Sequence, residues 1–335
     1  MTAANVRRYQ LHFGPDHAFV RRTGPEDVLR IGLTKPVDEA AALAGLLFAV
    51  CPRAHQVAVL RAAEDIAGIT LPRGQVAARD IVVLGEAVFC AVWRAALSWA
   101  RLLKTEVPVA AVQNARLAND ALSKAVFKGP WACIGGSPLE IDAPALSTAI
   151  DRLSQAFRAI RPLGEAVIAS AAQFKLRSHA GAALDEKSLV IEPGQSVCFE
   201  ETPRTLLDGP QRAANLAPWF EAQLDHAASL VARLHEAKDL LEGGSPVEAA
   251  DDLSGRGTGV VMTARGRLRH TLTLDAGRIN GWSAMAPTDW NFADNGPAAS
   301  AAAQLEAPGP DAANWLVAAF DPCAPCEVVM EVANA

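Results

Sequence analysis

Near the end of its 335 residues the chain reads Phe320-Asp321-Pro322-Cys323-Ala324-Pro325-Cys326. Two thiols three positions apart can face one metal ion, and the proline before the first of them restricts the backbone. Such a pair is half of a metal site. The other half stands far upstream, where the sequence reads Cys51-Pro52-Arg53-Ala54-His55. We expect the fold to bring Cys51 to the C-terminal cysteines.

Composition and charge narrow the class of protein. Hydrophobic residues make up 50% of the chain, which is ample for a large core. Lys and Arg number 31 against 37 Asp and Glu, so charge gives no reason to expect nucleic acid or an anionic membrane as partner. The first residues lack the apolar core of a secretory signal, and charges interrupt the most apolar stretch, 81–103. We therefore expect a cytoplasmic protein with no nucleic-acid or membrane partner.

The six cysteines do not resemble a disulfide framework in so long a chain. Outside the two segments quoted above, we interpret Cys90, Cys133 and Cys198 as reduced thiols of the core. The metal-binding hypothesis therefore concerns only Cys51, Cys323 and Cys326.

The hydrophobic pattern predicts mainly helices, with a smaller share of strands. Helices are expected over 37–50, 52–67, 76–104, 109–127, 144–178, 213–242, 299–306 and 311–320, and strands over 7–22 and 259–285. The segment 181–210 has a mixed pattern. No internal repeat and no long linker divides the chain, so we expect a single α+β domain over residues 1–335 with small antiparallel sheets.

The helix over 37–50 should deliver Cys51 at its C-terminal end. Pro52 suits the first turn of the next helix, which Gly68 should stop. Within that helix His55 lies one turn beyond Cys51, so the two side chains can share a face.

Four segments, in this order, resemble motifs of nickel–iron hydrogenase large subunits. That family carries Arg-x-Cys-Gly-x-Cys-x-x-x-His near its start, then Ala-Pro-Arg-Gly and Pro-Ser/Thr-x-Trp-Asn, and Asp-Pro-Cys-x-x-Cys-x-x-His at its end. The matching segments here are Cys51-Pro52-Arg53-Ala54-His55, Thr263-Ala264-Arg265-Gly266, Pro287-Thr288-Asp289-Trp290-Asn291 and Asp321-Pro322-Cys323-Ala324-Pro325-Cys326. Four collinear matches are more specific than one pair of cysteines. The resemblance implies a mainly helical, trimmed large-subunit-like fold.

The departures from the family pattern concern nickel and processing. Phe48 stands where the family has its first N-terminal cysteine, and Val329 stands where the C-terminal motif has its histidine. The sequence ends at Ala335, so we expect no tail of the kind that hydrogenase precursors lose after nickel insertion. This pattern resembles the hydrogenase-like maturation proteins of the HupK/HoxV type, which are similar to a large subunit but act as scaffolds for its iron unit.

The resemblance also implies a ligand set. In the family the second cysteine of each pair bridges iron and nickel, and the first binds nickel alone. Carried over, Cys51 and Cys326 would bind iron, with Cys323 as a third, transient ligand. Phe48 has no donor atom, so no nickel and no hydrogen oxidation are expected.

The diatomic ligands of the iron would need partners of their own. By the same resemblance, Arg265 and Thr288 would donate hydrogen bonds to the cyanides, and Pro287 would shape the wall around the carbonyl. His55 would orient a ligand by donating to a sulfur or to a neighbouring carboxylate.

This reading implies a non-catalytic carrier of the Fe(CN)2(CO) iron unit. It would receive the unit from the general hydrogenase maturation proteins that build it and pass it to the immature hydrogenase large subunit. Two alternatives stay open: a metal-free chaperone that mimics the large subunit in order to dock maturation partners, and a divergent hydrogenase large subunit.

Each site residue also has a simpler interpretation. His55 could be a satisfied histidine of the core, and Arg265 could lie on a strand surface. Thr288 could cap a turn. Cys323 and Cys326 alone could form a redox dithiol or half of a zinc site.

Overall fold

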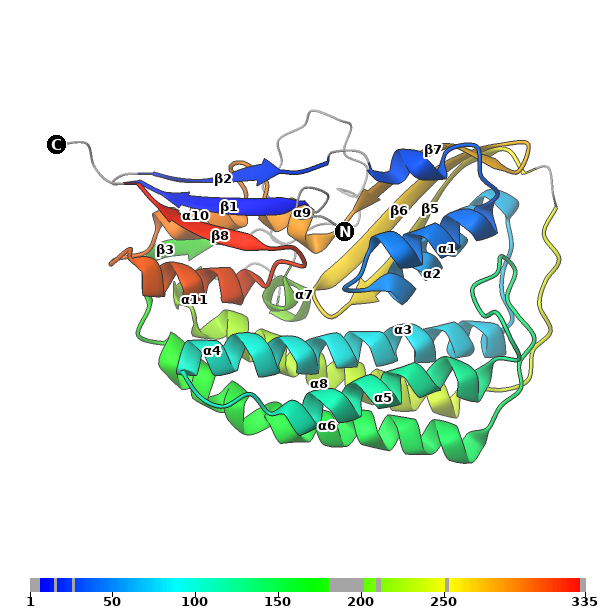
Figure 1. Ribbon diagram of the computed structural model, residues 1–335, viewed down its shortest axis with the longest axis horizontal. Helices are drawn as coiled ribbons and strands as arrows, with labels where there is room; N and C mark the ends of the chain where they lie inside the picture. The colour runs from blue at the N-terminus through cyan, green and yellow to red at the C-terminus, as the bar shows by residue number, and fades with distance from the viewer. Residues whose placement is uncertain are drawn as a thin grey trace.

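The structure is a computed structural model that describes residues 7–14, 17–25, 28–180, 202–208, 212–250 and 253–331. A layer of long helices lies on one side and small sheets with shorter helices lie on the other (Figure 1). The helices are α1 Val37–Leu47, α2 Pro52–Ala67, α3 Arg73–Arg94, α4 Ala100–Leu103, α5 Val109–Val126, α6 Ala143–Ala171, α7 Pro203–Asp208, α8 Ala217–Asp239, α9 Pro287–Asn291, α10 Pro297–Ala303 and α11 Pro310–Phe320. The strands are β1 Arg8–Phe13, β2 Ala18–Thr23, β3 Lys175–Ala180, β4 Arg212–Asn215, β5 Gly255–Thr263, β6 Gly266–Asp275, β7 Arg278–Met285 and β8 Cys326–Met330.

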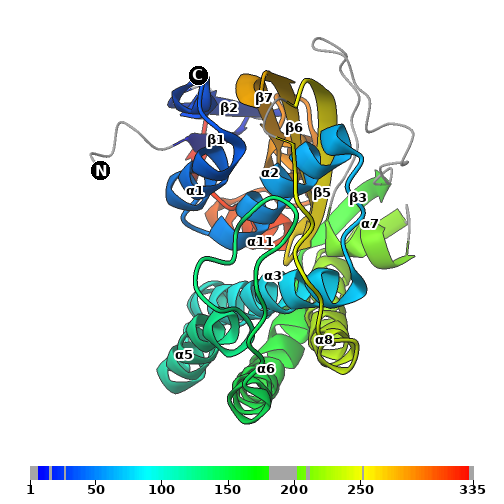
Figure 2. The same cartoon turned by 90° about the vertical axis from the view of Figure 1, so that its right-hand side faces the viewer.

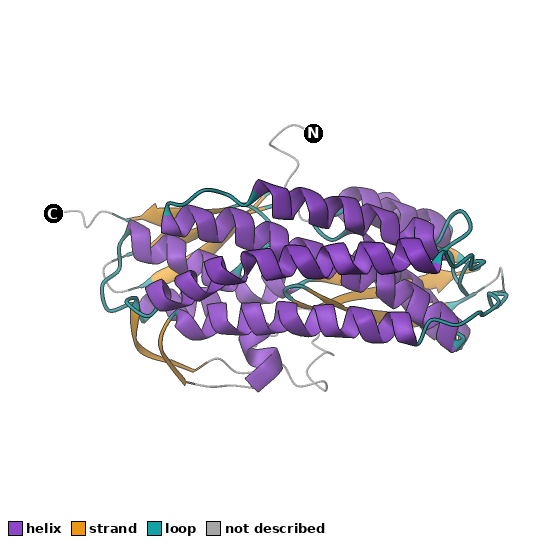
Figure 3. Cartoon of the chain, turned by 90° about the horizontal axis from the view of Figure 1, so that it is seen from below, coloured by secondary structure: helices purple, strands orange, loops and turns teal. Residues whose placement is uncertain are grey.

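The helical layer is built around α3. This helix packs against α5, α6 and α8, and the long helices run side by side when seen from below (Figure 3). A π-helical turn over Ala95–Trp99 joins α3 to α4, and Lys104 ends that helix in the left-handed conformation. The span Arg73–Leu103 is long and apolar enough to cross a membrane, but 78% of its most apolar window is buried inside the molecule. It is therefore the core helix of the bundle, and the cytoplasmic location stays a prediction.

The two ends of the chain meet in one sheet. Its strand order is β2-β1-β8, in which β1 and β2 form an antiparallel hairpin and β8 lies parallel to β1. In Figure 1 the red β8 lies beside the blue β1. The register pairs Tyr9 with Cys326, and the Tyr9 N–H donates to the Pro325 carbonyl at 2.9 Å. This pairing fixes the cysteine-containing segment against the N-terminal hairpin.

Helix α2, which begins just after Cys51, lies on the sheet β5-β6-β7 (Figure 2). The contact is close because β5 presents glycines to the helix backbone. A Cβ added at Gly259 would lie 2.0 Å from the Ala58 carbonyl oxygen, and one at Gly257 would lie 2.3 Å from the Ala62 carbonyl oxygen. Only residues without a side chain permit this approach. Through it, α2 is set at a fixed depth against the sheet.

The predicted helices and strands agree with the structure in most places, and α2 and its stop at Gly68 are confirmed. The helix over 37–50 ends three residues earlier, at Leu47, so Cys51 caps the start of α2 instead of ending α1. The helix over 144–178 ends at Ala171, and strand β3 follows from Lys175. The turn residues 15 and 16, Cys198 and most of 181–210 lie outside the described residues.

Candidate functional site

Cys51 occupies the N-cap position of α2, and Pro52 follows at the first helical position. The peptide N–H groups of the first turn donate to Glu86 on α3: both Arg53 N and Ala54 N lie 2.9 Å from a carboxylate oxygen. A carboxylate suits the partial positive charge at a helix N-terminus. Burial nevertheless raises the pKa of Glu86 to about 7, although these two N–H groups and the Arg53 guanidinium lower it. An acidic side chain of the core thus anchors the turn that carries Cys51.

Cys323 is fixed by Thr288, the second residue of α9. The Thr288 hydroxyl donates to the Cys323 sulfur at 3.1 Å and accepts from the Cys323 N–H at 2.9 Å. Helix α9 is itself anchored, because the Asp289 carboxylate accepts from the Ala286 N–H at 2.9 Å and from the Tyr9 hydroxyl at 3.2 Å. In this structure the hydroxyl of Thr288 therefore serves Cys323, and its donation to a cyanide stays a prediction.

Asp321 joins the end of α11 to two buried guanidinium groups. One carboxylate oxygen lies 2.8 Å from Arg94 Nη1 and 2.7 Å from Arg265 Nε. The Arg265 Nε also donates to the Asp321 carbonyl at 3.0 Å. Asp321 adopts a left-handed backbone with φ 45° and caps α11. Arg265 is thus buried and paired, which excludes the reading of a solvated residue on the strand surface.

Cys51, Arg265, Glu86 and a further thiol, that of Cys90, line one small cavity. The other lining residues are small or apolar: Ala54, Val83, Ala87, Thr263 and Ala264. The wall is therefore drawn from the start of α2, from α3 and from the tight turn between β5 and β6. The free space is about 10 Å³, so the cavity is narrow although three of its lining residues are alanines.

Cys323 affects the pKa of Cys51 although the two residues come from opposite ends of the chain. Burial raises the pKa of Cys51 well above its ordinary value, and the thiols of Cys323 and Cys90 raise it further, whereas Arg265 lowers it. Burial likewise raises the pKa of Cys323, and Arg265 and the Thr288 hydroxyl lower it. Both thiols are therefore neutral in the free protein, and Arg265 is the cation that favours their ionised forms.

Cys326 lies in other surroundings. It is the first residue of β8, and its sulfur lies 4.0 Å from the Glu327 carbonyl oxygen. Burial raises its pKa to about 12, a hydrogen bond with the Leu11 backbone lowers it, and Glu327 raises it. Cys323 thus influences the pKa of Cys51, and the predicted meeting of Cys51 with Cys326 stays a prediction. Neither Cys326, which lies on the strand paired with β1, nor Cys323 lines the cavity.

His55 makes its hydrogen bond to another histidine and not to a sulfur or a carboxylate. Its Nδ1 lies 2.8 Å from His270 Nε2, and Trp282 Nε1 donates to His270 Nδ1 at 2.8 Å. Because the indole can only donate, a neutral His270 carries its proton on Nε2 and donates to His55. Burial lowers the pKa of His270 to about 3 and that of His55 well below its usual range, with the His270 charge adding to the effect on His55. The reading of His55 as a satisfied core histidine is the one that fits.

The phenyl ring of Phe48 stacks on the His55 imidazole, with ring centroids 3.6 Å apart and planes 6° from parallel. Phe48 packs with the hydrophobic cluster between α1, α2 and β6, and it does not line the cavity. Pro287 is buried at the start of α9 and does not line the cavity either. Within the described ranges, no group of three or more His, Cys, Asp or Glu side chains is gathered to hold a metal ion. The ligand roles of Cys51, Cys323 and Cys326 therefore stay predictions.

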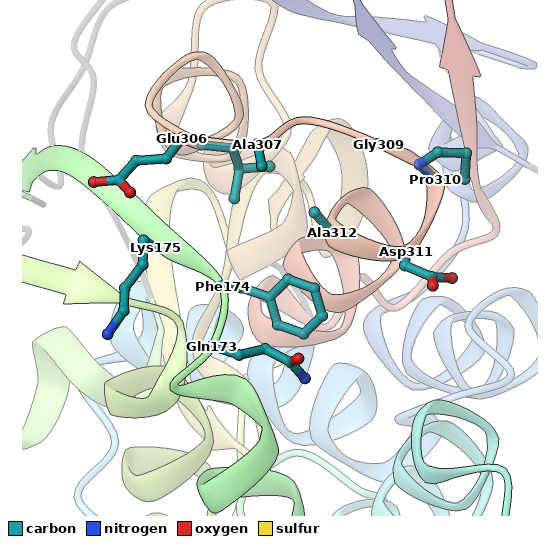
Figure 4. A pocket seen from close by; sticks show the side chains of 10 residues that line it. Gln173, Phe174, Lys175, Glu306, Ala307, Gly309, Pro310, Asp311 and Ala312 are labelled. Atoms are coloured by element: carbon teal, nitrogen blue, oxygen red, sulfur yellow. The ribbon is translucent and has the colours of Figure 1, made fainter.

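A larger pocket lies between the start of β3 and the loop into α11, around the Phe174 ring (Figure 4). The charged ends of Lys175, Glu306 and Asp311 point away from that ring. No cysteine or histidine lines this pocket. The cavity at Cys51 is therefore the better candidate site.

Comparison with known proteins decides the family. The hydrogenase expression/formation protein HupV of Azotobacter chroococcum mcd 1 is 30% identical over 326 residues, which cover 89% of this chain and 90% of the relative. The chain belongs to the HupK/HupV family of hydrogenase expression/formation proteins. Hydrogenase expression/formation protein HupK of Azotobacter vinelandii is 29% identical over 318 residues, which cover 84% of this chain and 85% of the relative. No protein-family model matches the sequence.

The fold of this HupK/HupV member is that of nickel–iron hydrogenase large subunits, as the sequence resemblance predicts. An NAD+-reducing NiFe hydrogenase in its H2-reduced state superposes with a TM-score of 0.67 at 17% identity, over 92% of each chain. A NiFeSe hydrogenase variant from Desulfovibrio vulgaris Hildenborough gives 0.65 at 14% identity, over 92% of each chain. The likeness at this level of identity concerns the fold alone.

Sequence reasoning missed several residues of the site in this HupK/HupV member. Glu86 and Cys90 lie on a helix that reads as a uniform core element, and Arg94 carries a charge that seemed only to interrupt that helix. One signal was present: Glu86, Cys90 and Arg94 follow each other at intervals of four residues, so they share a face of α3. No such signal is present for His270. The alternating pattern of its strand predicts a buried face but does not show which residues pack against that face.

Proposed function

We propose that this chain is a hydrogenase maturation protein that carries the Fe(CN)2(CO) unit to the immature hydrogenase large subunit. The observation that carries the proposal is that Cys51 and Arg265 line one cavity within a large-subunit fold, and it is supported by the effect of Cys323, held by Thr288, on the pKa of Cys51. The names of the relatives describe hydrogenase formation proteins and not hydrogenases, which supports a maturation role.

The donor set suits this cargo. Thiolates are soft ligands that bind low-spin iron well, and both sulfurs must lose their protons on binding. A buried guanidinium beside two such sulfurs favours their ionised forms and presents N–H donors where a metal-bound cyanide has a partly negative nitrogen. Arg265 lines the cavity and is held in place by Asp321, so it meets this requirement without rearrangement.

Transfer follows from an incomplete ligand set. The resemblance places Phe48 where a hydrogenase has a nickel thiolate, and the ring is committed to a stack with His55. A four-thiolate nickel site is therefore not expected, and iron held by fewer sulfurs is more readily released. In this scheme Cys326 would bind the iron during its transfer. Its thiol lies at the start of the edge strand β8 and would reach the iron once the segment 323–326 shifts.

The test is infrared spectroscopy with iron analysis on protein purified from cells that are making the hydrogenase. We expect bands for metal-bound cyanide and carbonyl in the wild type. We expect those bands and the iron to be lost in Cys51→Ala and kept in Cys133→Ala, whose thiol does not line the cavity. A wild type without such bands would contradict the carrier function.

One observation favours the alternative of a metal-free chaperone. The large-subunit fold extends over 92% of the chain, more than a two-thiol iron site would need. A chaperone that docks maturation partners by mimicry would keep its partners, and hydrogenase maturation would be unimpaired, when Cys51 and Cys323 are both replaced by Ser. The carrier predicts failed maturation in the same cells.

A further inference from the structure

Helix α8 carries two buried polar side chains on one face, in a helix whose other buried residues are mainly apolar. Gln223 and His226 are three positions apart, so they project from the same side of the helix. They are 1% and 5% exposed. A polar group in the core costs free energy unless it is hydrogen-bonded, so the partners of these two side chains indicate their role.

Gln223 binds the C-terminal end of α11. Its side-chain Nε2 donates to the Ala319 carbonyl at 2.7 Å and to the Ala318 carbonyl at 3.2 Å. The last carbonyls of a helix have no partner within the helix, and here one amide group satisfies two of them. Asp321 follows two residues after Ala319. Gln223 therefore fixes the backbone that presents the Asp321 carboxylate.

His226 binds the turn that carries Arg265. Its Nε2 lies 3.0 Å from the Thr263 carbonyl oxygen, and because a carbonyl only accepts, this nitrogen carries the proton and donates. Within the turn, the Thr263 hydroxyl donates to the Gly266 carbonyl at 2.9 Å and accepts from the Arg265 N–H at 3.2 Å. Burial and the nearby Arg94 lower the pKa of His226, against the Thr263 hydrogen bond that raises it, so the ring is neutral at pH 7.

We propose that Gln223 and His226 are positioning residues that together hold the Arg265 guanidinium at the cavity. The two segments that they bind are joined by the ion pair between Arg265 and Asp321, whose Nε and carboxylate oxygen lie 2.7 Å apart. One helix thus fixes both partners of that pair, and Arg265 in turn lines the cavity. The inference rests on the proposed carrier function for its purpose, because a guanidinium that binds a cyanide must be held in one place by its surroundings.

The same helix offers a matched control in His235. Its Nε2 lies 3.1 Å from the Ser154 hydroxyl on α6. This bond also ties α8 to a neighbouring helix, but Ser154 does not line the cavity. Loss of either histidine should therefore affect stability, and only loss of His226 should change the surroundings of Arg265.

The measurement is the exchange of the Arg265 side-chain Nε–H in deuterium oxide, followed by nitrogen-15 NMR on the full chain produced without maturation proteins. Its resonance is assigned by its absence in Arg265→Lys. In the wild type this N–H donates to the Asp321 carbonyl at 3.0 Å and should exchange slowly. His226→Leu and Gln223→Met remove the donor and keep a side chain of similar size, and each should speed the exchange at least about tenfold.

His226→Gln places an amide N–H close to the position of the imidazole Nε2, so exchange should return toward the wild-type rate, and His235→Leu should leave that rate unchanged. Circular dichroism checks that each variant is folded, and Gln223→Met tests the inference by itself if His226→Leu does not fold. Wild-type exchange in a folded His226→Leu or Gln223→Met variant would overturn the inference. Equal acceleration in His235→Leu, or equal rates in His226→Gln and His226→Leu, would also overturn it.

The carrier function and this inference fail separately. The exchange rate is measured without cargo, so it tests the positioning even if wild-type protein from cells making the hydrogenase shows no cyanide bands. If those bands are present, His226→Leu should shift their frequencies and His235→Leu should not. Unshifted bands in His226→Leu would leave the carrier standing and overturn the positioning role.

Discussion

The carboxylate of Asp321 is a buried anion whose loss should be costly, because it pairs with two guanidinium groups. The side chains of Arg94 and Asp321 are 4% and 11% exposed, and that of Arg265 is 11% exposed. Burial by itself lowers the pKa of Arg265, but the Asp321 carboxylate together with Cys323, Cys90 and Cys51 raises it above its usual value. Asp321 is the carboxylate among these groups and the partner that contacts the Arg265 guanidinium directly.

We expect Asp321→Asn to lower the free energy of unfolding by about 3–5 kcal/mol, because it leaves two buried guanidinium groups without their anion. Asn is a clean replacement here, since it tolerates the left-handed backbone that Asp321 adopts at φ 45°. The measurement is urea unfolding at neutral pH followed by circular dichroism.

Glu327→Gln is the matched control, because it makes the same change on the neighbouring strand. Glu327 pairs with Arg8 at 3.8 Å on the surface, with side chains 58% and 38% exposed. Its replacement should cost less than about 1 kcal/mol. The double variant Arg94→Met with Asp321→Asn should recover part of the loss, because one unpaired cation is removed.

Asp321→Asn should also make the segment that carries Cys323 less rigid. Asp321 holds the end of α11 two residues before Cys323, so its replacement should increase the rate at which a thiol reagent reaches Cys323. A cost below about 1 kcal/mol for Asp321→Asn, with unchanged reactivity of Cys323, would refute the reasoning that a buried ion cluster sets this segment.

Three other predictions concern the frame of the site. Gly259→Ala should destabilise the protein by about 3 kcal/mol in urea unfolding, because the added Cβ would lie 2.0 Å from a carbonyl oxygen of α2. As a control, a Cβ added at Gly243 would meet no atom within 4 Å, so Gly243→Ala should change the unfolding free energy by less than about 0.5 kcal/mol. Burial raises the pKa of Glu86 to about 7 in the folded protein, so the folded state holds the Glu86 proton more tightly than the unfolded chain does, and the stability that Glu86 contributes falls as pH rises from about 4.5 to about 7. Relative to Glu86→Gln, the wild type should lose about 2–3 kcal/mol of unfolding free energy over that pH range. A constant difference between the two proteins would contradict the raised pKa. Nitrogen-15 NMR at about pH 6 should show His270 neutral with its proton on Nε2, and Trp282→Phe should remove that preference; a protonated imidazolium in the wild type would contradict the hydrogen-bond direction.

The sequence predicted the frame of the fold because local signals mark it. Pro52 and Gly68 bound α2 as expected, since proline suits a first turn and Gly68 adopts φ 64° at the helix end. The turn at Asp275-Ala276-Gly277 likewise has positive φ at its last two residues, as a tight hairpin needs. Strand β8 was not predicted, because five residues after a cysteine motif show no reliable alternation.

The identity of the site residues was predictable where a motif carried them, but their partners were not. Arg265 and Thr288 came from the resemblance, yet what each contacts depends on Asp321 and Cys323, which approach from another part of the chain. Cys326 was assigned to the cavity by family position alone. Its place in the structure follows from a parallel pairing with β1, a long-range contact that no local pattern encodes.

The same long-range pairing explains how Cys323 is positioned. Strand β8 can add to β1 only when the segment 321–325 turns back from α11, and the turn requires the left-handed Asp321 that two buried arginines hold. Cys323 lies on that turn and Cys51 lies on the helix cap that Glu86 holds, so each thiol is positioned by an ion or a hydrogen bond of the core. Under the proposed function, sulfurs held in this way would need no metal to complete the fold. A carrier that fills and empties needs this property, because its stability must not depend on the cargo.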